Sequence, residues 1–377
     1  MAARRFGGSV QGNDMSIQVL ADRRPAERKV PMLEKKKIIL DCDPGSDDAI
    51  AIMLALFSEK LDVLGITVVN GNRILPKTLE NALRMKQFLG SSVPVFRGCE
   101  EPLVCNLIPG RKPELPRVTK NDCHGDYLKL PEATIQAELQ HAVNWLVDTF
   151  MASDGDITLV TVGPLTNIAM ALRMEPRIAG KIKEIVAMGG GHAACNISSS
   201  AEFNFWADPE AAKIVMDTPV PKVILPLDAT WKACISYEEA KELERIGTPA
   251  ARFAADLAKL RIEGLKVNDV SEHNFELRHT SGTVAERMLY RYDTDRAPIH
   301  DALAVAYCID PAVVTEYVDC NVDIDISQGL CDGRMVADVH NTLKGKAPIT
   351  CKVALNADSH AFVEMLFEHL SKTVPMK

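Results

Sequence analysis

The chain of 377 residues contains 47% hydrophobic and 25% charged residues and carries a formal net charge of −8 at pH 7. This composition is typical of a folded globular protein, and the negative charge argues against a general nucleic-acid binder, which normally presents a basic face. No apolar stretch is long enough to span a bilayer, no signal peptide is visible, and the ten cysteines form no close Cys-x-x-Cys pair, so we expect a cytoplasmic protein without a membrane partner.

The first 37 residues differ in composition from the rest of the chain. Nine basic side chains outweigh four acidic ones there, a local balance of 9 − 4 = +5, and the apolar residues show no regular period. We predict a flexible extension over residues 1–37 and a single catalytic domain over residues 38–377. A mitochondrial targeting segment is the alternative for the extension, but such segments avoid acidic residues.

From Ile38 onward, short apolar strands alternate with helices. Asp208 followed by Pro209 predicts the N-cap and the first residue of one of these helices. The alternation indicates an α/β fold with an open, mostly parallel, Rossmann-like sheet, in which ligands bind beyond the carboxyl ends of the strands. We predict strands over 38–40, 63–69, 93–96, 157–162, 184–188, 223–227, 322–326 and 335–339, with helices over 49–57 and 79–89.

Residues 265–298 are predicted to form a long polar insertion that crosses the site. A solvated role is the ordinary one for any single side chain in such a segment, and contact with the substrate is the alternative. The polar and aromatic candidates are Glu272, His273, Asn274, His279, Arg287, Tyr290, Tyr292 and Arg296.

An acidic loop follows the first predicted strand. Asp41, Asp43, Asp47 and Asp48 lie within eight residues, and four carboxylates at this density repel one another unless a cation offsets them. Hard oxygen ligands suit Ca²⁺ or Mg²⁺ rather than zinc. The alternative is that one aspartate caps the next helix and the others are solvated. Neither an EF-hand loop nor a Walker loop fits the residues of this segment.

Two further groups of polar residues lie far from the acidic loop. His300 and Asp301 open an apolar helical stretch, where Asp301 is either an ordinary cap or a distant cation ligand, and His300 is either a core histidine or a proton donor. A Met-Gly-Gly-Gly run at 188–191 precedes polar side chains that supply the donors and acceptors required by the hydroxyl groups of a sugar. These side chains are Asn196, Glu202 and Asn204.

Together these blocks resemble the nucleoside hydrolase family of the inosine–uridine type. The opening run Asp41 to Ala49 matches the family's acidic signature, and the resemblance extends in family order from about Ile38 to the C-terminal helix. The further matching blocks are Gly71-Asn72, Gly163 to Asn167, Met188 to Gly191, Ala201 to Asn204, and His300-Asp301.

The resemblance implies one bound Ca²⁺ that holds the ribose 2′- and 3′-hydroxyls and a water. Asp43 would take the proton of that water, and His300 would be the acid that protonates the leaving base. The metal ligands carried over are Asp43, Asp48, Asp301 and the backbone carbonyl of Val162. The substrate-binding residues carried over are Asp47, Asn72, Met188, Asn196, Glu202, Phe203 and Asn204, with His124 close to the site.

The implied activity is hydrolysis of the N-glycosidic bond of ribonucleosides to free base and ribose. We expect inosine and guanosine as substrates, and a broad inosine–uridine specificity is the alternative. Trp206 is either a candidate to stack on a purine or a buried core residue. We also expect a role in purine salvage and a homodimer or homotetramer. A nucleoside phosphorylase is an alternative, but it would need a phosphate cradle where this loop is anionic. A ribose-binding module without catalysis is a second alternative, and an acid-loop phosphatase is a third.

Overall fold

The computed structural model describes residues 35–112, 124–268, 295–342 and 347–372 of the chain. The predicted extension lies outside the described residues up to Glu34. Lys36 already belongs to the first strand, β1 (Lys36–Cys42), so the fold begins two residues before the predicted boundary. Within the predicted insertion, the candidates from Glu272 to Tyr292 lie outside the described residues, whereas Arg296 opens β8 (Arg296–Pro298).

Among the described residues, nine strands form one sheet in the order β10-β9-β11-β6-β5-β4-β1-β2-β3. The neighbours from β11 to β3 run parallel, while β9 is antiparallel to both β11 and β10. This arrangement confirms the predicted open, mostly parallel α/β sheet. The other strands are β2 (Leu61–Val68), β3 (Val95–Arg97), β4 (Ile157–Thr161), β5 (Ile182–Met188), β6 (Lys222–Leu225), β9 (Val314–Ile324), β10 (Met335–Asp338) and β11 (Cys351–Ala357). A separate pair joins β7 (Cys234–Ser236) to β8.

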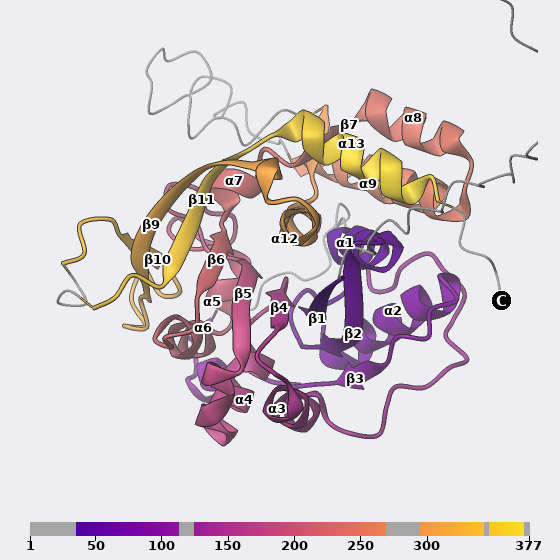
Figure 1. Cartoon of the computed structure of the whole chain (residues 1–377). Coiled ribbons are helices and arrows are strands. Elements are labelled where there is room, and N and C mark those ends of the chain that lie inside the picture. Colours follow the sequence, from indigo (N-terminus) through magenta and orange to yellow (C-terminus); the bar gives the residue numbers. More distant parts are fainter. Residues whose placement is uncertain (1–34, 113–123, 269–294, 343–346, 373–377) are drawn as a thin grey trace, which may run out of the picture. The chain divides into compact units, whose positions relative to one another are not determined.

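Helices cover both faces of the sheet (Figure 1). Successive side chains of a strand point to opposite faces of the sheet. On β1, Ile38 and Leu40 therefore pack in the hydrophobic core on one face, and Ile39 packs in the core on the other face. One layer contains α1 (Ser46–Phe57), α2 (Leu75–Phe88), α8 (Tyr237–Ile246), α9 (Pro249–Asn268), α12 (His300–Ile309) and α13 (Ser359–Leu370). The other contains α3 (Ala142–Ala152), α4 (Thr166–Met174) and α6 (Pro209–Met216). The short helices α5 (Phe203–Ala207) and α7 (Leu227–Thr230) complete the set that concerns the site.

Several predicted elements have different bounds in the structure. The strand predicted over 223–227 ends at Leu225, because Pro226 interrupts it and Leu227 opens α7. The first four residues of the predicted insertion are the end of α9. The strand β11 was not predicted. The N-cap at Asp208 is confirmed, since its carboxylate accepts a hydrogen bond from the Ala211 N–H at 3.1 Å. Within the described residues, no helix has the length and apolar character needed to cross a membrane.

Candidate metal-binding active site

The strand register brings the predicted site residues to one edge of the sheet. Cys42 at the end of β1 pairs with Val68 of β2, Asp41 pairs with Thr161 of β4, and Thr161 pairs with Ala187 of β5. The loops that follow these four strands therefore leave the sheet at the same level, which is where ligands bind in parallel α/β folds. They carry Asp43, Gly71-Asn72, Val162-Gly163 and Gly189-Gly190.

The Asp48 carboxylate organises the loop that carries Asp43. Its Oδ1 accepts a hydrogen bond from the Asp43 N–H at 3.2 Å, and its Oδ2 accepts one from the Gly45 N–H at 2.9 Å. The side-chain amide of Asn72 also donates to Oδ2 at 3.2 Å. The aspartate is thus both a cap for the first turn of α1 and a buried charged group that faces the loop after β2.

Asp43 is held from one side only. The Asn72 N–H donates to its Oδ2 at 2.6 Å, whereas its buried Oδ1 has no hydrogen-bond partner in the described structure. Glycine is required beside this carboxylate, because a Cβ at Gly163 would lie 2.6 Å from Oδ1 and a Cβ at Gly71 would overlap Oδ2. Burial and the nearby Asp48 raise the pKa of Asp43 well above its ordinary value. The Asp43 carboxylate therefore has one oxygen that a ligand could occupy.

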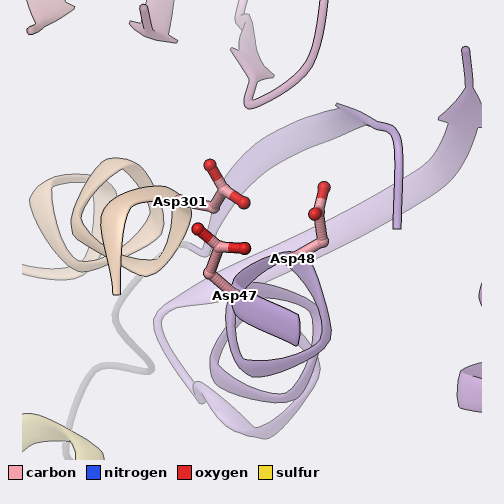
Figure 2. A group of neighbouring side chains, drawn as sticks. All are labelled: Asp47, Asp48 and Asp301. Atoms are coloured by element: carbon pink, nitrogen blue, oxygen red, sulfur yellow. The ribbon is translucent and has the colours of Figure 1, made fainter. Parts of the chain in front are cut away.

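Asp47, Asp48 and Asp301 form a buried carboxylate cluster. One oxygen from each lies within 4.8 Å of the others. Figure 2 shows that Asp47 and Asp48 extend from the first turn of α1 and that Asp301 comes from the first turn of α12. Burial raises the pKa of Asp48 to about 6, and burial together with Asp47 and Asp48 raises the pKa of Asp301 well above its ordinary value. Buried carboxylates that repel one another in this way fit a cation, and oxygen ligands fit a hard divalent ion.

Hydrogen bonds join the loop after β4 to the short helix α5. Asn204 donates from Nδ2 to the Val162 carbonyl at 3.0 Å and to the Met188 carbonyl at 3.2 Å. Glu202 is the N-cap of α5, and its carboxylate accepts hydrogen bonds from the backbone N–H groups of Gly190, Asn204 and Phe205. Burial raises the pKa of Glu202 to about 7. These contacts connect α5 to the ends of β4 and β5.

The other predicted sugar- and base-contacting residues of this region, Asn196, Phe203 and Trp206, lie nearer the surface. Asn196 is exposed and accepts a hydrogen bond from the Phe203 N–H at 3.0 Å, and Phe203 itself is half-buried. The Trp206 ring packs 6.5 Å from the Phe203 ring between centroids, and the Lys112 ammonium group lies 4.4 Å from the centre of the Trp206 ring. Since Lys112 already packs on that indole, the structure provides no support for stacking of a base on Trp206.

His300 is the first residue of α12 and is buried. Its Nδ1 lies 2.7 Å from the Thr230 hydroxyl, and the Trp231 ring meets the imidazole edge-on at 5.1 Å between ring centroids. Burial and the positive charge of Arg261 lower the pKa of His300 to about 3. The imidazole is therefore neutral at pH 7, whereas the role of leaving-group acid implied by the resemblance needs a protonated imidazole.

This low pKa has a consequence for stability. Below pH 6.5 the unfolded chain binds a proton at His300 that the folded chain excludes, so the contribution of this residue to the free energy of unfolding falls as the pH decreases from about 6.5 towards 3. We expect His300→Gln to flatten the decrease of stability between pH 6.5 and about pH 5. Urea unfolding of both proteins at several pH values measures this slope, and equal slopes would contradict the expectation.

His124 and Arg261 flank Asp47. The Nδ1 atom of His124 accepts a hydrogen bond from the Ser46 N–H at 3.3 Å and lies 3.8 Å from Asp47 Oδ1. Arg261 Nη1 lies 3.0 Å from the same oxygen. Burial by itself raises the pKa of Asp47, but Arg261, His124 and His300 outweigh it, so the pKa is lowered. Asp47 is therefore the member of the cluster that most readily stays ionised.

Asp41 lies beneath the site rather than in it. Its Oδ1 accepts hydrogen bonds from the Thr67 hydroxyl at 2.5 Å and from the Asn167 amide at 2.8 Å, and Asn167 also accepts from the Cys99 N–H at 2.7 Å. Burial raises the pKa of Asp41 to about 7. These bonds connect β1, β2 and α4 directly below the loop that carries Asp43.

Sequence reasoning missed Arg261, Thr230 and Trp231. Arg261 carries a readable signal, because it falls on the buried stripe of α9 that includes Ala251, Ala254 and Ala258. A charged residue on an apolar helix face requires a partner. That partner is Asp47, which lies on a different helix.

Residues 38–364 match the family described as inosine-uridine preferring nucleoside hydrolase. The chain is 41% identical over 334 residues to the pyrimidine-specific ribonucleoside hydrolase RihB of Escherichia coli O157:H7, covering 88% of this chain and 95% of that protein.

Solved structures give the same picture of the fold. A plant nucleoside hydrolase, the PpNRh1 enzyme, superposes with a TM-score of 0.75 at 25% identity, over 90% of this chain and 99% of that one. A purine-preferring ribonucleoside hydrolase from Gardnerella vaginalis superposes with a TM-score of 0.74 at 28% identity, over 89% and 98% of the two chains. Because the names of these proteins give different bases, the expected preference for inosine and guanosine is unsupported.

Proposed function

The chain belongs to the inosine-uridine preferring nucleoside hydrolase family, and from this membership we propose how its site works and which nucleosides it cleaves. The coarse activity follows from the family itself: the chain is an N-ribohydrolase that splits ribonucleosides into base and ribose. What we propose beyond this activity is the identity of the bound cation, the residues that bind the cation and the ribose, and the preferred nucleobase.

We propose that the cation is Ca²⁺ and that its ligands are Asp43, Asp48, Asp301 and the Val162 carbonyl. The unpartnered Oδ1 of Asp43 and the crowding of Asp48 against Asp301 support this assignment. When bound, the ion supplies positive charge that orients a water and the ribose hydroxyls and makes that water easier to deprotonate. Asp47, Asn72, Asn196, Glu202 and Asn204 would hold the ribose, with Met188 and Phe203 towards its 5′ side and His124 beside Asp47.

In the proposed reaction, Asp43 accepts the proton of the attacking water. The support for this role is that its carboxylate keeps one buried oxygen without a hydrogen-bond partner in the described structure. As the glycosidic bond breaks, positive charge develops on the ribose ring, and the surrounding carboxylates stabilise that charge. Water attacks from the face opposite the departing base, so the configuration at the anomeric carbon inverts.

His300 is the proposed proton donor to the departing base. Its imidazolium is a strong acid but a minor species at neutral pH, because the pKa is lowered to about 3. We therefore assign His300 a smaller share of catalysis than Asp43. The Thr230 hydroxyl at Nδ1 fixes the orientation of the ring.

For the base, we propose a preference for pyrimidine ribonucleosides. The support is the identity of 41% with the pyrimidine-specific relative, which extends over 88% of this chain. A cytoplasmic location and a homodimer or homotetramer stay predictions.

The test is base release from uridine, cytidine, inosine and guanosine by calcium-loaded protein in phosphate-free buffer. We expect turnover of all or some of these nucleosides, with the highest kcat/KM for a pyrimidine, and no acceleration by added phosphate. Acceleration by phosphate would select a phosphorylase, and tight binding without base release would select a binding module. A higher kcat/KM for inosine or guanosine would reject the proposed base preference alone.

The glycines beside Asp43 provide a second test of the site. Gly71→Ala is expected to lower kcat/KM on the order of 100-fold, because the new Cβ would overlap the Asp43 carboxylate and displace it. Gly180→Ala is the matched control, since a Cβ there meets no atom within 4 Å. Comparable activity of both variants would show that Asp43 does not need its observed position.

A further inference from the structure

Arg261 connects the two halves of the acidic site. It lies on α9, and its side chain is 8% exposed. Nη1 contacts Asp47 Oδ1 at 3.0 Å and donates to the Ser46 hydroxyl at 2.8 Å, both in the first turn of α1. Nε donates to the Pro298 carbonyl at 3.0 Å, two residues before His300. One guanidinium thus sets α1 against the start of α12.

Asp47 is close enough to Asp48 and Asp301 to be a metal ligand. One oxygen from each of the three carboxylates lies within 4.8 Å of the others. Among the described residues, no such group includes Asp43. The proposed ligand set nevertheless uses Asp43 and reserves Asp47 for the sugar. Proximity alone does not explain this division between two neighbouring carboxylates.

The ion pair with Arg261 supplies the explanation. The Asp47 oxygen that faces the guanidinium is engaged by a permanent positive charge, and Arg261 cannot lose its proton near neutral pH. A divalent cation that approached the same oxygen would meet that charge, and repulsion in a buried site is strong. Asp43 Oδ1, like Asp47 Oδ1, is buried without a hydrogen-bond partner, but no ion pair joins Asp43 to a cationic side chain among the described residues.

We propose that Arg261 is a positioning residue that withholds Asp47 from the metal and keeps this carboxylate available for a ribose hydroxyl. This inference rests on the proposed function, because it assumes a cation held by Asp48 and Asp301 and a sugar beside it. Arg261 would thus determine which carboxylates bind the metal and which one binds the sugar.

The test replaces the guanidinium with a neutral side chain of similar length. We expect metal-free Arg261→Met to bind Ca²⁺ about tenfold more tightly than the wild type in calorimetric titration, because Asp47 becomes an additional ligand and a positive charge is lost. We expect its KM for nucleoside to rise, because the same carboxylate no longer serves the sugar. A merely structural role would weaken both calcium binding and substrate binding.

Three further variants complete the experiment. Asp47→Asn in the Arg261→Met background should cancel the gain in calcium affinity. Arg261→Lys keeps the positive charge and should keep the wild-type affinity. Arg296→Met should leave calcium binding unchanged, because the contacts of Arg296 are with Cys234, Glu239 and Ser359, outside the acidic cluster.

The outcomes separate this inference from the proposed function. Unchanged or weaker calcium binding by Arg261→Met, with the wild type binding normally, would overturn the role of Arg261 and leave the metal assignment intact. An Arg261→Met that fails to fold, as judged by circular dichroism, would be replaced by Arg261→Lys, for which a large gain or loss of calcium affinity overturns the role. Absence of calcium binding by the wild type would reject the metal assignment and this inference with it.

Discussion

Asp43→Asn is expected to lower kcat/KM on the order of 10³-fold, because the amide cannot accept the proton of the attacking water. The substitution keeps the shape of the side chain, and the amide oxygen can still accept the hydrogen bond from the Asn72 N–H. We therefore expect the fold to survive and the KM to change less than kcat. Initial rates of base release at saturating calcium measure both constants.

The control for this variant is Asp62→Asn, an exposed aspartate on β2. It removes the same charge from a neighbouring strand without touching the site, so its rate should equal that of the wild type. An Asp43→Asn protein that retains more than about a tenth of the wild-type kcat would show that another group takes the proton.

Asp301→Asn is expected to lower calcium affinity on the order of 100-fold and to make activity depend on added calcium. Asp301 is the proposed metal ligand on α12, and the proposed ligand set includes no other residue of that helix. The same substitution should raise the melting temperature of the metal-free protein, because it removes a carboxylate whose pKa is raised by burial and by the nearby Asp47 and Asp48.

Two measurements separate these effects. Thermal unfolding with and without calcium should show a higher melting temperature for the metal-free variant and a smaller increase on adding calcium than for the wild type. Asp256→Asn, at an exposed position of α9, is the matched control and should change neither value. An unchanged calcium-dependent increase in Asp301→Asn would exclude this carboxylate from the metal site.

The parts of the site that could be predicted from sequence are local or belong to a recognisable signature. Asp43, Asp47 and Asp48 lie close together in the chain after an apolar run, so their density was visible before any fold was known. Asp301 is far from them in sequence, so the residues alone left it as either an ordinary cap or a distant cation ligand, and the resemblance to a known family favoured the second. The α/β alternation was readable because each strand and helix is itself a short periodic segment.

Properties that depend on tertiary surroundings could not be predicted. His300 has its low pKa because it is buried beside Arg261, and neither burial nor that neighbour follows from the residues around it. The ion pair of Arg261 with Asp47 joins helices α9 and α1, whose packing no local pattern specifies. The base preference depends on side chains that differ between relatives with the same fold, so the shared motifs do not determine it.

The separation of Asp48 and Asp301 along the chain also bears on the order of folding. More than half of the sequence lies between them, including the strands β2 to β6, and α12 packs on α1 in the folded structure. Contacts that close so large a loop form late, after the more local strand pairings. A cation that needs both carboxylates has little to bind in early intermediates. Its stabilisation should therefore fall mainly on the native state, so we expect a bound ion to slow unfolding and to leave the rate of refolding nearly unchanged.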